Sequence, residues 1–242
     1  MDGQGRALRT RRALIQAAAE VFAEEGFAHA SLRAVSERAG VSSGALHFHF
    51  PHKRALAEAV EAQAAEAVRG ITRAARSRPG DVLQTVVDAT HALMHHLAQD
   101  AVACAGFGLA GDLARRADSP PRREWQHWIE ESLREAEHGG ALAEGVRAAD
   151  AARAVVAATT GFQVLGSTDA RWLSAHHITR FWELLLPRLA AAHCLDRLLC
   201  AGSAPPPTAP PRTAPPGSAP PRTAPPGSAP PRQPPAPTDL PA

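Results

Sequence analysis

The sequence predicts an all-α fold, and three observations carry that prediction. Apolar residues recur at helical spacing along most of the chain before residue 201, and Gly, Pro or Asp separates one such segment from the next. No stretch of useful length shows the strict alternation that is typical of a half-buried strand. The composition is 45% apolar but only 5% aromatic, without any tyrosine, so Ala and Leu side chains must form most of the helical core.

The first helices have the pattern of two short helices packed under a longer one. We expect the long helix from about Ala7 to Glu25 and the short pair within residues 31–50. Ser31 can cap the first short helix, Gly40 can end it in the left-handed conformation, and Ser42 can cap the second. A second helix with a small, polar outer face fits the major groove of DNA. The pattern therefore predicts a helix-turn-helix DNA-binding domain at residues 6–54, the alternative being an ordinary helical hairpin within a core.

The residues expected at DNA form two groups, one that reads base edges from the second short helix and one that contacts phosphates. Lys53, the only lysine in the chain, is expected to contact a phosphate at the start of the next helix. Residues 1–54 carry eight Lys/Arg against five Asp/Glu, which fits a DNA-binding domain. The full set of expected contacts is Thr10, Arg11, Ser31, Arg33, Ser42, Ser43, Gly44, Ala45, His47, His49 and Lys53.

Residues 55–200 are predicted to form a second, helical domain. A long helix from Pro51 to about Arg76 connects it to the helix-turn-helix and ends before Pro79-Gly80. Further amphipathic segments lie near Asp81–Gln99, Val102–Arg116, Pro121–His138, Asp150–Leu165 and Arg171–Leu195.

From Arg6 to Val60 the sequence resembles the DNA-binding domain of TetR-type repressors. The residues that carry the resemblance are Ala17–Phe22, Glu25–Phe27, Ala39–Val41 and Gly44–Phe50. Within that family, Gly44–Phe50 is most similar to the γ-butyrolactone receptors of antibiotic-producing actinobacteria. The chain departs from them at two outward positions, with Ser43 where they commonly carry lysine and His47 where they carry tyrosine.

The resemblance implies a homodimeric, ligand-responsive repressor that a γ-butyrolactone-type signal releases from a pseudo-palindromic operator of double-stranded DNA. One alternative is a pseudo-receptor of the same fold that senses an antibiotic or another metabolite. A second is a helical interaction protein that recruits partners through its proline-rich tail. An enzyme is not supported, because the sequence contains no nucleophile elbow, phosphate-binding glycine loop or HExxH motif, and no catalytic residue is expected.

The resemblance also implies that residues 55–200 form a ligand-binding and dimerisation domain with an inducer cavity. Trp125, followed by Leu133, Ala136, Gly140 and Leu142, matches the spacing around the cavity tryptophan of the butyrolactone receptors. Plain packing in the core is the other interpretation of this tryptophan. The expected ligand-binding set is Trp125, Trp128, Val86, Val87, Thr90, Phe107, Thr159, Phe162 and Gln163, which mixes apolar walls with a few hydrogen-bonding groups.

Two apolar stripes on the last helices exceed what a peripheral helix needs, and they resemble the four-helix dimer interface of TetR-type repressors. Packing wholly within one protomer is the alternative. The stripes are Ala151, Ala154, Val155, Ala158, Phe162 and Leu165, and then Trp172, Phe181, Leu184, Leu185 and Leu189.

Residues 201–242 hold seventeen prolines and a ten-residue repeat that begins at Ala209 and recurs from Ala219. Such a sequence cannot bury a core, so we expect a disordered or polyproline II tail. It is either a solvated linker or a partner motif of the P-x-x-P type.

Several patterns exclude other classes of site. No apolar run approaches a membrane span and the N-terminus lacks a signal-peptide core, so we expect a cytoplasmic protein. Cys104, Cys194 and Cys200 have no metal-ligand pattern and are expected as reduced thiols. His91 and His95 have metal-binding spacing but no third ligand, so neither a metal nor another cofactor is expected.

Overall fold

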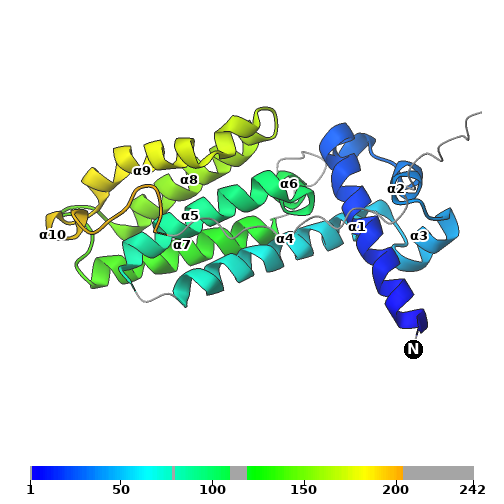
Figure 1. The fold of residues 1–242 in the computed structure, drawn as a ribbon, viewed down its shortest axis with the longest axis horizontal. Helices are drawn as coiled ribbons and strands as arrows, with labels where there is room; N and C mark the ends of the chain where they lie inside the picture. The colour runs from blue at the N-terminus through cyan, green and yellow to red at the C-terminus, as the bar shows by residue number, and fades with distance from the viewer. Residues whose placement is uncertain (1, 78–79, 110–118, 204–242) are drawn as a thin grey trace, which may run out of the picture. The chain divides into compact units, whose positions relative to one another are not determined.

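The protein is all-helical, as the sequence predicts (Figure 1). The computed structural model describes residues 2–77, 80–109 and 119–203, and no strand occurs among them. Residues 1–208 belong to one compact unit and residues 209–242 to another. The predicted tail lies outside the described residues beyond Ser203.

Three helices form the end of the molecule drawn on the right of Figure 1, namely α1 (Asp2–His29), α2 (Leu32–Ala39) and α3 (Ser43–His49). Helix α1 extends beyond the expected bounds at both ends, and Gly26 interrupts it with φ 74° and ψ 156°. These helices share one apolar core with the first half of the next helix. Its members include Leu14, Phe22, Val35, Leu46 and Leu56.

The long helix α4 (Lys53–Arg76) links this end to the rest of the unit. It begins two residues later than expected, because His52 supplies the cap: its Nδ1 accepts a hydrogen bond from the Ala55 amide at 3.0 Å. Helix α4 ends at Arg76, as predicted.

The body of the unit contains α5 (Val82–Gln99), α6 (Ala101–Gly108), α7 (Pro120–His138), α8 (Ala148–Gly166), the short 3₁₀ turn η2 (Ala170–Leu173), α9 (Ala175–Leu189) and α10 (Ala192–Leu195). The expected helix over residues 102–116 is described only to Gly108, since residues 110–118 lie outside the described residues. The expected single helix over residues 171–195 is divided in three. Ser174 caps α9, and beyond Leu189 the chain pairs with residues 141–143 instead of continuing the helix.

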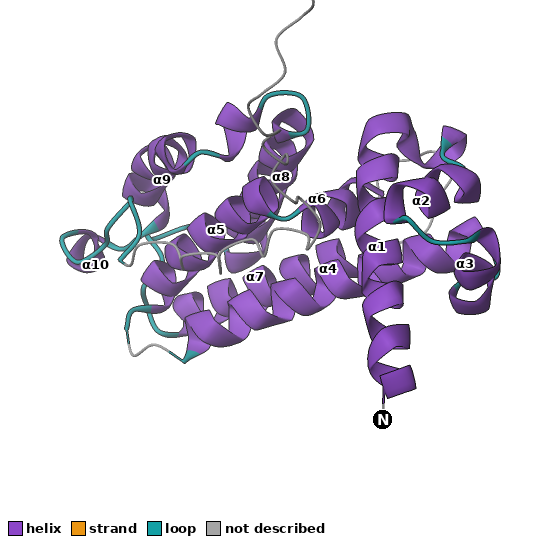
Figure 2. Ribbon diagram, turned by 45° about the vertical axis from the view of Figure 1, so that its right-hand side comes forward, coloured by secondary structure: helices purple, strands orange, loops and turns teal. Residues whose placement is uncertain are grey.

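Helix α6 lies between α1 and α5 (Figure 2), and its residues belong to two apolar cores. Val102, Ala105 and Leu109 belong to the apolar core of α1–α4, whereas Ala103 and Phe107 belong to the core of the body. This helix therefore contacts the predicted DNA-binding end through one face and the body through another. The expected domain boundary at residues 54 and 55 stays a prediction, because residues 1–208 form one unit by their contacts.

Helix α5 holds the last described residues in place. Gln84 exchanges two hydrogen bonds with the main chain of Leu199, and Asp88 accepts hydrogen bonds from the amide and hydroxyl of Ser203. Over the described part of the chain, no helix is both long enough and apolar enough to span a membrane.

Candidate nucleic-acid interface and ligand cavity

The two short helices have the local structure that the sequence predicts. The Ser31 hydroxyl accepts from the Ala34 amide at 3.0 Å, and the Ser42 hydroxyl accepts from the Ala45 amide at 3.2 Å. Between the helices, Gly40 adopts φ 65° and ψ 32°, the left-handed conformation that glycine tolerates without strain. The caps and the turn thus follow from residues that lie within a few positions of one another.

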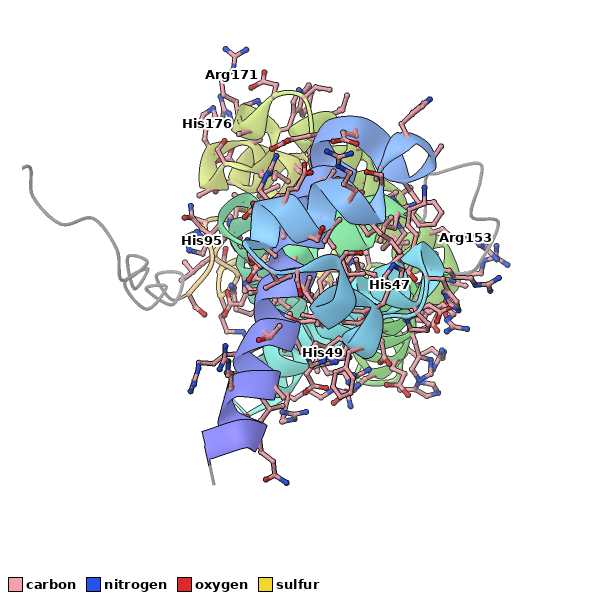
Figure 3. All side chains as sticks on the ribbon, turned by 90° about the vertical axis from the view of Figure 1, so that its right-hand side faces the viewer. His47, His49, His95, Arg153, Arg171 and His176 are labelled. Carbon is pink, nitrogen blue, oxygen red and sulfur yellow. The ribbon has the colours of Figure 1, made fainter. Side chains whose placement is uncertain are left out.

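Most exposed residues of α3 are small or polar. His47 and His49 lie at the end of the molecule that carries this helix (Figure 3). Ser42, Ser43, Gly44 and His47 are exposed, while Ala45 and His49 are half-buried. Sequence reasoning missed Phe48, whose side chain is 82% exposed. Its position four residues after Gly44 could have indicated a place on the same face.

The first turns of α1 bring basic groups to the same end. Arg11 is exposed, and its guanidinium carbon lies 5.2 Å from the centroid of the Phe50 ring, just after α3. Thr10 is half-buried. Three further arginines of this helix are exposed, namely Arg6, Arg9 and Arg12.

The Arg38 side chain of α2 ties this helix to α1 through ion pairs. Arg38 donates two hydrogen bonds to the Glu24 carboxylate, at 3.0 and 2.7 Å, and lies 3.4 Å from Glu20. The hydrogen bond from Arg38 lowers the pKa of Glu24 below its usual value. Arg33, an expected DNA contact, is exposed but paired with Glu37 at 2.7 Å.

Lys53 has a structural role that the sequence did not indicate. Its Nζ donates to the carbonyl oxygens of Phe27, Ala28 and Ala30 at 2.6, 3.0 and 2.8 Å, and it lies 4.7 Å from the centroid of the Phe27 ring. An ammonium group has three donors, and all three are used here. Lys53 thus binds carbonyl oxygens at and just beyond the carboxyl-terminal end of α1, and its contact with a phosphate stays a prediction.

A cavity of about 100 Å³ lies between α5, α6, α7 and α8. Its apolar walls come from Leu93, Phe107, Trp125 and Val156, and its polar groups come from Arg122, Gln126, Thr159 and Thr160.

Trp125 is anchored across this cavity. Its indole N–H donates to the Thr159 hydroxyl oxygen at 3.0 Å. The single proton of that hydroxyl has two main-chain acceptors in reach, the carbonyl oxygens of Val155 at 2.9 Å and Val156 at 3.1 Å. The Trp128 ring stacks against Trp125 with 5.4 Å between centroids. The hydrogen bond joins α7 to α8, so a molecule that displaces the Trp125 ring would alter how these helices pack.

Arg122 lines the cavity one turn before Trp125 and has no counter-charge among the described residues. Its Nη2 donates to the neutral Gln163 side-chain oxygen at 2.9 Å, and its Nε is buried without a hydrogen-bond partner. Burial lowers the pKa of the Arg122 guanidinium, although an arginine stays protonated at neutral pH. Sequence reasoning missed Arg122, although its i, i+3 spacing from Trp125 places both on one helix face.

Comparison with known proteins identifies the kind of protein to which these features belong. Residues 14–60 match the family described as "Bacterial regulatory proteins, tetR family". The crystal structure of TylP, a tetR regulator from Streptomyces fradiae, is 30% identical, with 81% of this chain and 86% of that one covered and a TM-score of 0.62. The chain belongs to the tetR family of bacterial regulatory proteins. As a member of the tetR family, it is a DNA-binding transcriptional regulator.

Two further similarities concern receptor proteins. The A-factor receptor protein of Streptomyces griseus is 29% identical over 194 residues, which cover 78% of this chain and 67% of that protein. A crystal structure of a gamma-butyrolactone receptor, described as an ArpA-like protein, is 25% identical with a TM-score of 0.70, and covers 81% of this chain and 96% of that one. The resemblance noted in the sequence is thus confirmed beyond the helix-turn-helix.

The structure of this tetR-family regulator brings only some of the expected ligand-binding residues together. Phe107, Trp125 and Thr159 line the cavity. Gln163 does not line it but accepts a hydrogen bond from Arg122, which does. Phe162 packs near the rings of Trp172 and Phe181 instead. The other four are buried but do not line this cavity, namely Val86, Val87, Thr90 and Trp128. Sequence patterns do not fix the rotation of α5 against the cavity, so they could not show which of its side chains line it.

The described residues contain no group of three or more His, Cys, Asp or Glu side chains that could hold a metal ion. His91, which has metal-binding spacing from His95 in the sequence, has its Nε2 at 2.9 Å from the Cys200 carbonyl oxygen.

Proposed function

We propose that this regulator is a ligand-responsive repressor that binds operator DNA through α1–α3 and leaves it when a small molecule enters the Trp125 cavity. The observation that carries the proposal is the position of α6. Phe107 of this helix lines the cavity, while Val102, Ala105 and Leu109 pack in the apolar core of α1–α4. A ligand that moves α6 would therefore change the support of the DNA-binding helices.

A γ-butyrolactone-type ligand is the first candidate, on the strength of the similarity to the gamma-butyrolactone receptor. The cavity of about 100 Å³ is small beside the roughly 300 Å³ at which ligand pockets usually begin. A lactone with an alkyl tail would have to enlarge it by displacing Phe107 or Trp125. The free energy spent on that enlargement reduces how far ligand binding can shift the protein from its operator-binding state to its released state.

A dimer places two α3 helices on one operator, and the exposed apolar side chains of α8 and α9 are the surface we propose for it. Val164 is 52%, Leu165 43% and Leu184 80% exposed. The expected stripes are only partly available, because Ala151, Val155 and Leu189 are buried within the protomer. A two-fold dimer through the remaining residues would require a pseudo-palindromic operator.

A gel shift with DNA upstream of the protein's own gene tests the proposal. We expect the protein to retard this DNA and a γ-butyrolactone to release it, whereas a Trp125→Phe variant should require a different ligand concentration for release. Release by an unrelated metabolite alone would favour the pseudo-receptor alternative. Absence of any shift on this DNA and on a randomised operator library would overturn the proposal.

A further inference from the structure

We propose that the ligand of this regulator carries a carboxylate or a comparable anionic group, which Arg122 binds inside the Trp125 cavity. The inference rests on the proposed ligand response and narrows the chemical class of the ligand. It also favours a compound other than a neutral lactone.

The first observation is that the half-buried Arg122 guanidinium has no counter-charge among residues 2–77, 80–109 and 119–203. Its one observed partner is the neutral side-chain oxygen of Gln163, and its Nε is buried without any acceptor. By contrast, the more accessible Arg69 on α4 forms ion pairs with both Glu66 and Glu124. Taking a cation out of water without a counter-charge costs free energy. An anion in the cavity would recover that cost.

A second group at the same end of α7 points to the same ligand chemistry. The Ser119 hydroxyl, one turn before Arg122, is buried without a hydrogen-bond partner and does not cap the helix. The Arg122 Nε can only donate a hydrogen bond, and the Ser119 hydroxyl can donate one, so an acceptor atom suits both groups. The amino-terminal end of this 19-residue helix also carries the positive end of its dipole.

The rest of the cavity defines the other part of the ligand. Leu93, Phe107, Trp125 and Val156 form an apolar wall opposite the polar groups. This wall suits a hydrocarbon chain or a flat ring, so the predicted ligand is an amphiphilic acid. A lactone presents one neutral carbonyl oxygen to the guanidinium, whereas a carboxylate presents two oxygens, which can accept two parallel N–H bonds, and neutralises its charge.

The Arg122–Gln163 hydrogen bond gives the bound anion a way to act on the protein. A carboxylate on Arg122 would compete with the Gln163 oxygen for the same Nη2 donor. The Gln163 side chain also lies against α6, where a Cβ added to Gly108 would stand 3.9 Å from the Gln163 Nε2. If Arg122 exchanged the Gln163 oxygen for the carboxylate, the Gln163 side chain would be released. That side chain lies next to α6, the helix whose residues belong to both apolar cores.

The test compares γ-nonalactone with the hydroxycarboxylate that ring opening makes of it, because the two have the same carbon skeleton. Binding to the full chain is measured by tryptophan fluorescence, since Trp125 lines the cavity and Trp128 stacks against it. We expect the hydroxycarboxylate to bind the wild-type protein at least about tenfold more tightly than the lactone. Arg122→Gln should abolish this preference, and Arg134→Gln, an exposed change on the same helix, should retain it.

Benzoate and benzamide form a second pair, which covers the case in which the alkyl chain does not fit. No preference for the acid in either pair rejects the proposal, and so does an acid preference that survives Arg122→Gln. The wild-type comparison needs no variant, so it stands even where Arg122→Gln fails to fold.

Operator release is measured on the same samples by gel shift and separates this inference from the proposed function. Release by the lactone alone, with equal effect on Arg122→Gln, leaves the ligand response intact and overturns the anion site. Tight binding of the acid through Arg122 without release of any operator supports the anion site and contradicts the ligand response.

Discussion

Gly106 of α6 lies so close to Ala64 of α4 that a methyl group added to the glycine would stand 2.4 Å from the Ala64 Cβ. The same methyl would be 3.3 Å from the Val60 carbonyl oxygen. Only a hydrogen atom fits between these helices. The contact joins the helix that lines the ligand cavity to the helix that leads into the DNA-binding end.

Gly106→Ala should therefore destabilise the protein. Separating α4 from α6 is expected to lower the free energy of unfolding by about 1–3 kcal/mol. Gly70→Ala on α4 is the matched control, because nothing lies within 4 Å of its added Cβ. That change should instead stabilise the helix, by about 0.5–1 kcal/mol. Urea unfolding followed by circular dichroism measures both, and equal midpoints for the two variants would contradict the close approach.

Lys53→Met should affect stability more than DNA binding, because the Lys53 ammonium is committed to three carbonyl oxygens. We expect a loss of about 2 kcal/mol or more in the free energy of unfolding. The dependence of operator affinity on salt should keep its slope. Arg11→Met, at an exposed position expected to contact phosphate, should instead reduce that slope by about one. A lower salt slope for Lys53→Met at unchanged stability would instead indicate that Lys53 contacts a phosphate.

Phe48→Ala should weaken operator binding while leaving the fold intact. The 82% exposed ring contributes little to the core, so its removal should change the melting temperature only slightly. An apolar side chain on this face of α3 can contact a thymine methyl group, and its loss should cost about tenfold in affinity. Leu46→Ala on the same helix is the contrasting variant, since Leu46 is 1% exposed and its truncation should destabilise the fold. Equal operator affinity for Phe48→Ala and wild type would remove Phe48 from the interface.

Thr159→Val should loosen Trp125. The variant removes the oxygen that accepts the indole N–H and leaves that buried donor unpaired, at a cost of about 1–3 kcal/mol. Thr159→Ser keeps the hydroxyl and should retain most of the stability. The fluorescence maximum of the protein reports on the indole environment, and identical spectra for all three proteins would argue against the hydrogen bond.

Leu184→Glu should prevent dimer formation if α8 and α9 form the interface. Burying a charge against a second copy without a partner is costly, so the variant should sediment as a monomer and lose affinity for a palindromic operator. Leu199 offers a control, because it is 55% exposed but lies beyond α10. Leu199→Glu should leave the oligomeric state unchanged. A dimeric Leu184→Glu would place the interface elsewhere.

Local features were predictable from the sequence because the interactions that form them span only a few residues. The caps at Ser31 and Ser42 and the left-handed Gly40 depend on neighbours within four positions. The all-α class and the bounds of α4, α5 and α7 to within two residues follow from spacing alone. The break between η2 and α9 was missed, because helical periodicity continues through Ser174 while a cap and a distant main-chain pairing decide where the helices end.

By itself, the sequence determined the helix-turn-helix, the family resemblance and the presence of Trp125 at a candidate ligand site. The tertiary structure alone decided that Lys53 reaches back 23 to 26 residues to the end of α1. It also decided that Arg122 lies against Gln163, 41 residues away, and meets no counter-charge in the part of the chain that the structure describes. Contacts at such separations depend on how whole helices rotate and pack, and no short-range pattern encodes that.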